Sequence, residues 1–172
     1  DHVRIRLTGF LSPELDPQGT GYQLKQSLIA LGSGGIWGTG IGNSIQKLYY
    51  LPASSNDFIF SIIGEEFGFI GCFTVILLFV LFLYCGARIA LNCSDLFGML
   101  LAIGLTFCIG MEAVIHIGVA TGCLPTKGLT LPFISTGGSA LFVSMVQTGI
   151  LINIAKSNEL GTSPMGAEKI YE

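Results

Sequence analysis

FGFIGCFTVILLFVLFLYCGA, at residues 67–87, is the stretch that decides the fold class. It contains no charged side chain, and about 20 apolar residues in a helix are enough to cross a bilayer core of about 30 Å. With FIFSIIGEE before it, the stretch predicts a transmembrane helix over 58–87. Only 11% of the 172 residues are charged, against about 25% in a typical soluble domain. The sequence therefore predicts an integral membrane protein.

Two further apolar stretches complete an all-α polytopic fold with three transmembrane helices. One is apolar apart from Glu112 and His116, and the other is SALFVSMVQTGILINIA. Between them, PTKGLTLPFISTGG holds two prolines and three glycines, which argue against a continuous helix. The predicted segments are a loop over 1–57, helices over 58–87, 96–123 and 139–155, a connector over 88–95, a loop over 124–138 and a tail over 156–172. Because the chain opens on DHVRIR rather than on methionine, we expect a piece of a longer protein.

Basic residues near the ends of the spans give the orientation. Arg88 in the connector and Lys156 at the start of the tail favour a cytoplasmic position for both segments. The residues that oppose this are Lys127, Arg4 and Arg6. The two loops are therefore predicted on the non-cytoplasmic side. The net charge of −3 gives no basis for a nucleic-acid partner.

The first loop carries a short amphipathic helix and a glycine-rich run. GYQLKQSLIALG places Leu24, Leu28 and Leu31 at helical spacing, which suits the membrane interface or packing on the bundle. GSGGIWGTGIGN, at 32–43, has two interpretations. It is either a backbone cradle for phosphate or a close-packed loop beside Trp37, and it lacks the P-loop and dinucleotide-binding patterns. We favour close packing.

Acidic residues lie at the start of the first span. Asp57 directly precedes it, where a carboxylate caps a helix or, if it is accessible, accepts a proton from a sugar hydroxyl. Glu65 and Glu66 lie about two turns further on, where charge is costly, so we expect them to face the bundle or a wet cavity. A structural ion pair and a substrate role both remain open for these two residues.

Inside the second span, Glu112 and His116 lie four residues apart on one helix face. They are interpreted as a structural intramembrane pair that braces neighbouring helices, with a path for a transported group as the alternative. Five cysteines, at 72, 85, 93, 108 and 123, have no C-x-x-C spacing and are predicted to be small hydrophobes without disulfide or metal roles. No cluster of metal ligands is evident.

Three long stretches carry a resemblance to a known family. They are TGYQLKQSLIALGSGGIWGTGIGNSIQKLYYLP, NDFIFSIIGEEFGFIG and LPTKGLTLPFISTGGS. Together they resemble the SEDS proteins of bacteria (shape, elongation, division and sporulation). Within that family, GNSIQKLYYLP and LPTKGLTLPFIS are most similar to the division branch and its sporulation relative.

The resemblance implies that the chain is the C-terminal part of a larger SEDS bundle in the bacterial cytoplasmic membrane. The implied activity is peptidoglycan glycosyl transfer, in which lipid II is polymerised into glycan strands during septal cell-wall synthesis. The implied partners are a class B penicillin-binding protein, which cross-links the strands, and other proteins of the division machinery. A lipid II flippase and a non-catalytic scaffold for the penicillin-binding protein are the alternatives.

The resemblance also assigns roles to individual residues. Asp57, in NDFIF, matches the essential aspartate of the family and becomes the catalytic candidate. Lys47 and Lys127 are expected to neutralise pyrophosphate, and a divalent cation that assists them stays open as the one cofactor. The remaining substrate-binding residues implied by matched positions are Gln46, Glu66, Thr130 and Ser135.

Some positions depart from the family pattern. LPASSNDFIF replaces the usual LPEAHTDFIF, so Ala53 and Ser54 stand where the family has Glu and His. STGGSA replaces SYGGSS. Glu112 and His116 stand where relatives often carry Gln and Asn, which keeps polarity at these positions but introduces groups that titrate.

Overall fold

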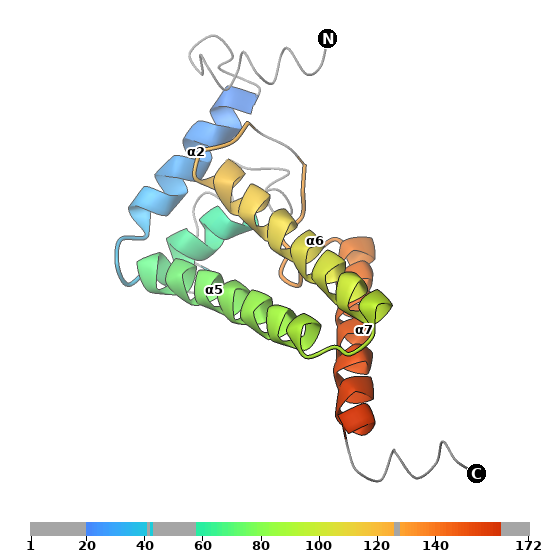
Figure 1. Cartoon of the computed structure of the whole chain (residues 1–172). Coiled ribbons are helices and arrows are strands. Elements are labelled where there is room, and N and C mark those ends of the chain that lie inside the picture. Colours follow the sequence, from blue (N-terminus) through green and yellow to red (C-terminus); the bar gives the residue numbers. More distant parts are fainter. Residues whose placement is uncertain (1–19, 41, 43–57, 126–127, 163–172) are drawn as a thin grey trace, which may run out of the picture.

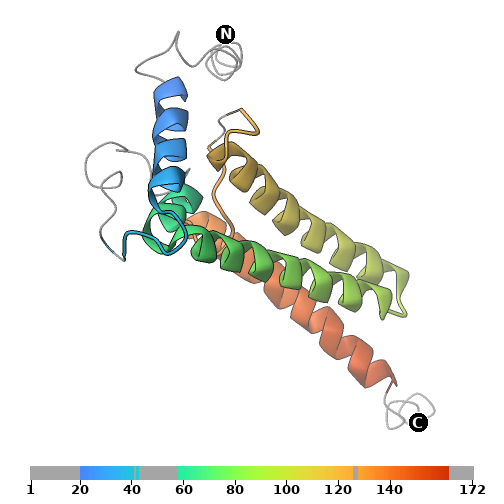
Figure 2. The ribbon, with the colours of Figure 1, turned by 90° about the vertical axis from the view of Figure 1, so that its left-hand side faces the viewer.

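The computed structural model describes residues 20–40, 42, 58–125 and 128–162. Within these ranges the chain forms four helices and no strand: α2 (Thr20–Ser33), α5 (Ile59–Leu91), α6 (Leu96–Ala120) and α7 (Gly138–Thr162). The last three are each long and apolar enough to cross a membrane. Figures 1 and 2 show α6 and α7 as extended rods and α2 steeply inclined to α6 and to the longer part of α5. The predicted all-α membrane fold with three spans is confirmed.

The turn between α5 and α6 is shorter than predicted. α5 continues to Leu91 rather than ending at 87, because the RIAL sequence consists mostly of residues that favour helix. Arg88 lies in its last turn, where a positive charge suits the helix dipole. Asp95 then caps α6 by accepting a 2.9 Å hydrogen bond from the Gly98 backbone N–H. The connector therefore needs only residues 92–95.

α6 ends at Ala120, three residues before the predicted end. Gly122 has a φ of 74° in the left-handed region. Its N–H donates to the Val119 carbonyl at 3.1 Å, and the Cys123 N–H donates to the Gly118 carbonyl at 2.8 Å. These two bonds form a Schellman motif, which stops the helix even though apolar residues continue beyond it.

α7 extends seven residues beyond the predicted end at 155, to Thr162. Residues 138–158 of α7 have the length and composition of a span. The extra turns include Lys156, Glu159 and Leu160, which favour helix and so extend it into the predicted polar tail.

α2 forms where the amphipathic pattern predicts it, but its buried face differs from the predicted stripe. Leu24, Ser27 and Ala30 are buried, whereas Leu28 is 46% exposed. The Ser27 hydroxyl donates to the Ala120 carbonyl at 2.8 Å. It also lies 2.6 Å from the Ser61 hydroxyl, which must then be the donor of that bond. A small polar residue therefore joins α2 to α5 and α6 alongside the leucines, of which Leu31 packs against Gly64 of α5.

The five cysteines all lie among the described residues and are free thiols, as predicted. Three of them are exposed on the helices or just after α6 rather than buried: Cys85, Cys108 and Cys123.

Candidate functional site

α5 is a broken helix. Gly68 has a φ of 67° and a ψ of −160°, a conformation that only glycine adopts readily. Residues 69–91 measure about 34 Å at about 1.5 Å per residue, which matches a bilayer core of about 30 Å. Residues 59–67 form a separate half-helix, and Figure 1 shows the two parts running in different directions. The membrane-spanning part of the predicted 58–87 helix therefore begins after Gly68.

The glycine-rich segment 34–40 is inserted into this break. In an unbroken helix, the N–H groups of residues 69 and 70 would donate to the carbonyls of Glu65 and Glu66. Here those carbonyls accept from the N–H groups of Thr39, at 2.9 Å, and Gly40, at 3.1 Å. The freed N–H groups of Phe69 and Ile70 donate to the carbonyls of residues 35 and 36, at 2.9 and 3.4 Å. Segment 34–40 and residues 64–70, which we call the helix joint, thus exchange four backbone hydrogen bonds.

Three glycines make the helix joint possible because side chains would collide with backbone. A Cβ atom on Gly34 would clash with the Gly64 carbonyl oxygen, and one on Gly38 would clash with the Glu66 carbonyl oxygen. A Cβ atom on Gly68 would meet the Gly38 nitrogen. Close packing of the run is therefore confirmed at Gly34 and Gly38, whereas a Cβ atom on Gly32 or Gly35 would meet nothing within 4 Å and Trp37 is 82% exposed.

The helix joint also holds the two glutamates of the half-helix. Glu65 is 3% exposed, as expected for a charge facing the protein. Glu66 is half-buried, and its Oε1 atom is buried without a hydrogen-bond partner. An acceptor oxygen held dry in this way is available to a donor from outside the described residues.

The half-helix begins one residue later than a cap at Asp57 would require. The N-cap position falls on Phe58, which has no side-chain capping bond. Phe58 is 3% exposed and packs with Val119 near the end of α6. The predicted cap at 55–57 falls on residues outside the described ranges and stays a prediction. Asp57 directly precedes this anchored residue in the sequence, and it lies outside the described residues.

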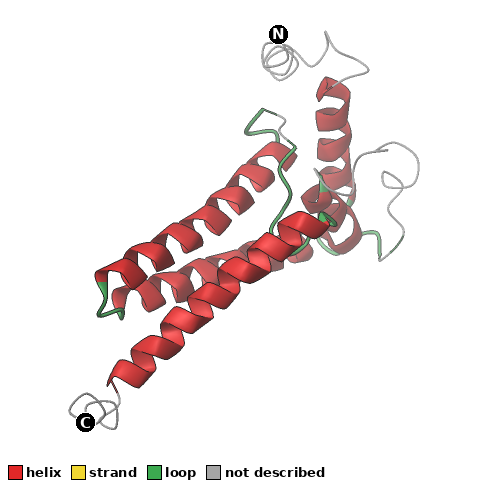
Figure 3. Ribbon diagram, turned by 90° about the vertical axis from the view of Figure 1, so that its right-hand side faces the viewer, coloured by secondary structure: helices red, strands yellow, loops and turns green. Residues whose placement is uncertain are grey.

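The segment after α6 returns into the helix bundle instead of lying wholly outside it, as Figure 3 shows. The ring of its Phe133 lies 5.8 Å from that of Phe82 on α5. Leu83, the residue after Phe82 on α5, packs against Gly110 of α6. Gly110 lies about 15 Å before the end of α6, so Phe133 lies well inside the bundle. Non-helical backbone at such depth is tolerated when protein covers it, and Leu131 is 1% exposed. Within the predicted loop over 124–138, the described residues 128–137 thus form a re-entrant segment.

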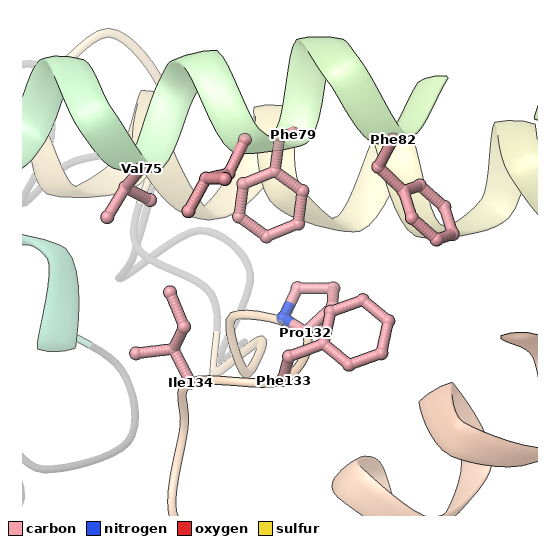
Figure 4. A pocket seen from close by; sticks show the side chains of 7 residues that line it. Val75, Phe79, Phe82, Pro132, Phe133 and Ile134 are labelled. Atoms are coloured by element: carbon pink, nitrogen blue, oxygen red, sulfur yellow. The ribbon is translucent and has the colours of Figure 1, made fainter. Parts of the chain in front are cut away.

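Phe133 has a φ of 66°, which is rare for an aromatic residue. Figure 4 shows it beside an apolar recess of about 240 Å³ between the re-entrant segment and the middle of α5. The recess is lined by Val75, Leu78, Phe79, Phe82, Pro132, Phe133 and Ile134. With an apolar lining at mid-span, it suits hydrocarbon from lipid or from a neighbouring helix.

His116 anchors the re-entrant segment. It is 1% exposed, and its Nδ1 atom lies 2.7 Å from the Leu129 carbonyl oxygen. Because that oxygen only accepts, Nδ1 must carry the hydrogen. Glu112, four residues earlier on the same helix, is half-buried. His116 thus holds the re-entrant segment through Nδ1, and its predicted pairing with Glu112 stays a prediction.

Replacing His116 by leucine is expected to lower the free energy of unfolding by about 1–2 kcal/mol, because the partly buried Leu129 carbonyl loses its donor. Asparagine places an amide nitrogen near the position of Nδ1 and should recover most of this loss. Thermal unfolding of the intact protein in detergent measures both variants. Equal unfolding temperatures for the wild type and the leucine variant would contradict this role.

The predicted site residues fall into three groups. Glu66 belongs to the helix joint, whereas Thr130 is half-buried and Ser135 is 5% exposed in the re-entrant segment. The predicted residues that lie outside the described ranges are Gln46, Lys47, Asp57 and Lys127. In the described ranges, no group of three or more His, Cys, Asp or Glu side chains is arranged to hold a metal ion. A divalent cation therefore stays a prediction.

The helix joint and the anchoring of the re-entrant segment are features that the sequence motifs did not identify. The glycines at 34, 38 and 68 were visible as residues, but nothing in the sequence pairs the loop with the helix. The signal that was available is the second glycine cluster, FGFIG, inside an otherwise helical apolar run.

Comparison with known proteins shows a match to one family of bacterial proteins. The family model for the cell cycle proteins FtsW, RodA and SpoVE matches residues 1–160. A protein of Synechocystis named "Probable peptidoglycan glycosyltransferase FtsW" is 46% identical over 169 residues, which are 98% of this chain and 43% of that protein. "Stage V sporulation protein E" of Bacillus subtilis is 47% identical over 151 residues, 88% of this chain and 41% of that protein. The chain thus spans about two fifths of the length of these relatives.

A solved structure has the same arrangement of helices. It is described as "Structural coordination of polymerization and crosslinking by a peptidoglycan synthase complex". The match has a TM-score of 0.71 at 30% sequence identity and covers 90% of this chain and 42% of that one.

Proposed function

Because the chain belongs to the family of FtsW, RodA and SpoVE cell cycle proteins, we propose that it is part of a peptidoglycan glycosyltransferase that polymerises lipid II into glycan strands. The observation that carries the proposal is the match to a named probable peptidoglycan glycosyltransferase over 98% of the chain. At 46% identity, this similarity includes the stretches around both the helix joint and the re-entrant segment.

The helix joint and α2 lie at the end of the bundle opposite the 92–95 connector. We assign the helix-joint end to the outer face of the cytoplasmic membrane, where lipid-linked precursors are polymerised. Arg88, on the connector side, supports this orientation through the positive-inside rule. The glycan would then grow at the helix-joint end while the lipid tail stays in the membrane.

In the proposed reaction, the 4-hydroxyl of an incoming lipid II sugar attacks the anomeric carbon of the lipid-linked strand. A new glycosidic C–O bond forms as the bond to the pyrophosphate oxygen breaks, with inversion at carbon. Asp57 accepts the proton of the attacking hydroxyl, and undecaprenyl pyrophosphate leaves with the bonding electrons. The half-helix supports this role because the residue after Asp57, Phe58, is anchored and buried.

The other proposed residues bind substrate. Lys47 and Lys127 neutralise the pyrophosphate. Glu66 accepts a hydrogen bond from a sugar hydroxyl through Oε1, the atom that is buried without a partner in the described structure. The residues assigned to the remaining polar contacts are Gln46, Thr130 and Ser135.

The partner we propose is a class B penicillin-binding protein, which cross-links the new strands, together with other proteins of the division machinery. The solved structure that shares this fold is described as a peptidoglycan synthase complex that coordinates polymerisation and crosslinking. Exposed apolar side chains along α5 and α6, such as Leu78 and Phe107, leave surface for lipid and for further helices.

Lipid II polymerisation in detergent tests the proposed function. The intact protein, purified with its penicillin-binding partner and given lipid II in micelles, is expected to produce long glycan strands. Without leaflets a flippase has no measurable product, and a scaffold makes no glycan when the polymerising domain of every partner is inactivated. Absence of strands under these conditions would overturn the assignment in favour of one of those two alternatives.

A further inference from the structure

We propose that the helix joint is a positioning element for glycosyl transfer, with Gly38 and Thr39 as its positioning residues. This inference rests on the proposed function. The helix joint fixes the angle between the half-helix 59–67 and the membrane-spanning residues 69–91. That angle sets where the polar groups at the outer end of α5 stand relative to substrate.

The contacts of the helix joint make it rigid rather than hinge-like. The segment is closed on itself by a 2.7 Å hydrogen bond from the Gly38 N–H to the Gly34 carbonyl. Four further backbone bonds link it to α5, and the Thr39 hydroxyl adds a 3.0 Å bond to the Glu65 carbonyl. Each bond gives a partner to a backbone group that an interrupted helix would otherwise leave unpaired. Both parts of α5 are therefore held in one relative orientation.

The same bonds argue against an ion site at the break. Broken membrane helices often bind ions through the free N–H and carbonyl groups of their half-helix ends. In the helix joint, the carbonyls of Glu65 and Glu66 and the N–H groups of Phe69 and Ile70 are all used by segment 34–40. Segment 34–40 already supplies hydrogen-bond partners for these backbone groups. The helix joint therefore contributes by fixing the relative orientation of the two parts of α5.

The residues assigned to the reaction lie next to the helix joint in the sequence. Segment 34–40 leads into the stretch that carries Gln46 and Lys47, and the half-helix 59–67 begins directly after Phe58 and Asp57. The described ends of that stretch are therefore both attached to the helix joint. Glu66, with its buried Oε1 atom, lies within it. The helix joint thus holds the chain on both sides of Gln46, Lys47 and Asp57, and it contains Glu66. All four residues are assigned to the reaction.

Gly38→Ala tests the proposal, with Gly32→Ala as the matched control. A methyl group on Gly38 collides with the Glu66 carbonyl, whereas one on Gly32 meets no atom within 4 Å. We expect Gly38→Ala to lower kcat for lipid II polymerisation by about tenfold to 10²-fold, the effect of misplacing reacting groups by about 1 Å. KM should change by less than about threefold, because binding is not the step that is lost. Gly32→Ala should keep wild-type kinetics.

Thr39 supplies a second test that does not depend on a steric clash. Thr39→Val removes the hydroxyl that bonds to the Glu65 carbonyl and keeps the shape of the side chain. We expect kcat to fall roughly fivefold, the effect of one lost hydrogen bond. Thr39→Ser keeps the hydroxyl and should restore kcat, which a general loss of packing would not allow.

Thermal unfolding accompanies each assay, so that only folded variants are compared. Wild-type kcat in both Gly38→Ala and Thr39→Val would overturn the positioning role, as would equal losses in Thr39→Val and Thr39→Ser. If Gly38→Ala does not fold, the two Thr39 variants decide. A wild type that makes no glycan would overturn the proposed function together with this inference, whereas an active wild type with unaffected variants would overturn this inference alone.

Discussion

Asp57→Asn is expected to reduce polymerisation of lipid II by the intact protein by about 10²–10⁴-fold, the usual contribution of general acid–base catalysis. Asparagine has nearly the same shape as aspartate but accepts no proton at neutral pH. The half-helix should remain folded, because its N-cap position is taken by Phe58 and not by Asp57. Initial rates of glycan formation in detergent, at saturating lipid II, measure the effect.

Asp95→Asn is the matched control for this prediction. It makes the same chemical change at the opposite end of the bundle, where asparagine still caps α6 by accepting from the Gly98 N–H. Its rate should equal that of the wild type. Near-normal synthesis by Asp57→Asn, with unchanged folding, would remove Asp57 from the mechanism and move attention to Glu66.

Gly68→Ala is expected to lower the free energy of unfolding by about 3 kcal/mol or more. Alanine does not readily adopt the backbone conformation of Gly68, with a φ of 67° and a ψ of −160°. Its Cβ atom would also press on the Gly38 nitrogen and the Ile36 carbonyl oxygen. Relief requires the helix joint to open, which breaks the backbone hydrogen bonds between segment 34–40 and α5. The yield of folded protein and its unfolding temperature in detergent should both fall.

Gly104→Ala provides the comparison for this stability prediction. Gly104 lies inside α6, where an added Cβ atom meets nothing within 4 Å. Alanine favours helix over glycine by about 1 kcal/mol, so this variant should be as stable as the wild type or slightly more stable. Similar unfolding temperatures for Gly68→Ala and Gly104→Ala would show that the break in α5 does not require glycine.

The spans were predictable because their signal is local and strong. Lipid requires each crossing segment to be apolar and to satisfy its own backbone, so length and composition suffice to find α5, α6 and α7. The ends were less predictable because apolarity continues past the stopping signals. α6 stops at a Schellman motif around Gly122, and α7 continues into residues that favour helix beyond its apolar part.

The buried face of α2 shows what hydrophobic periodicity does not predict. A leucine stripe predicts burial when the partner surface is apolar and wide, but here α2 crosses the polar backbone at the end of α6. The Ser27 hydroxyl reaches the Ala120 carbonyl, and Leu28 is left exposed. Such a contact depends on which carbonyl is free at the end of another helix, and hydrophobic periodicity carries no information about that.

The proposed site also combines residues that the sequence predicted with contacts that it did not predict. The motif around NDFIF selected Asp57 by resemblance, and Glu66 was a candidate from its depth in the span. Nothing in the motifs indicated that Glu66 lies in a broken helix or that His116 bonds to the Leu129 carbonyl. Both features arise between segments far apart in the sequence, and spacing along one helix does not predict them.

The sequence by itself determined the membrane class, the three spans, the family and the chemical types of the candidate groups. Each of these follows from local composition or from long motifs, which are properties of the chain before it folds. The tertiary structure alone decided that segment 34–40 completes the hydrogen bonds of α5 and that the segment after α6 returns to mid-span. The physical reason is that buried backbone groups must find partners, and those partners come from whichever segment packing brings within reach.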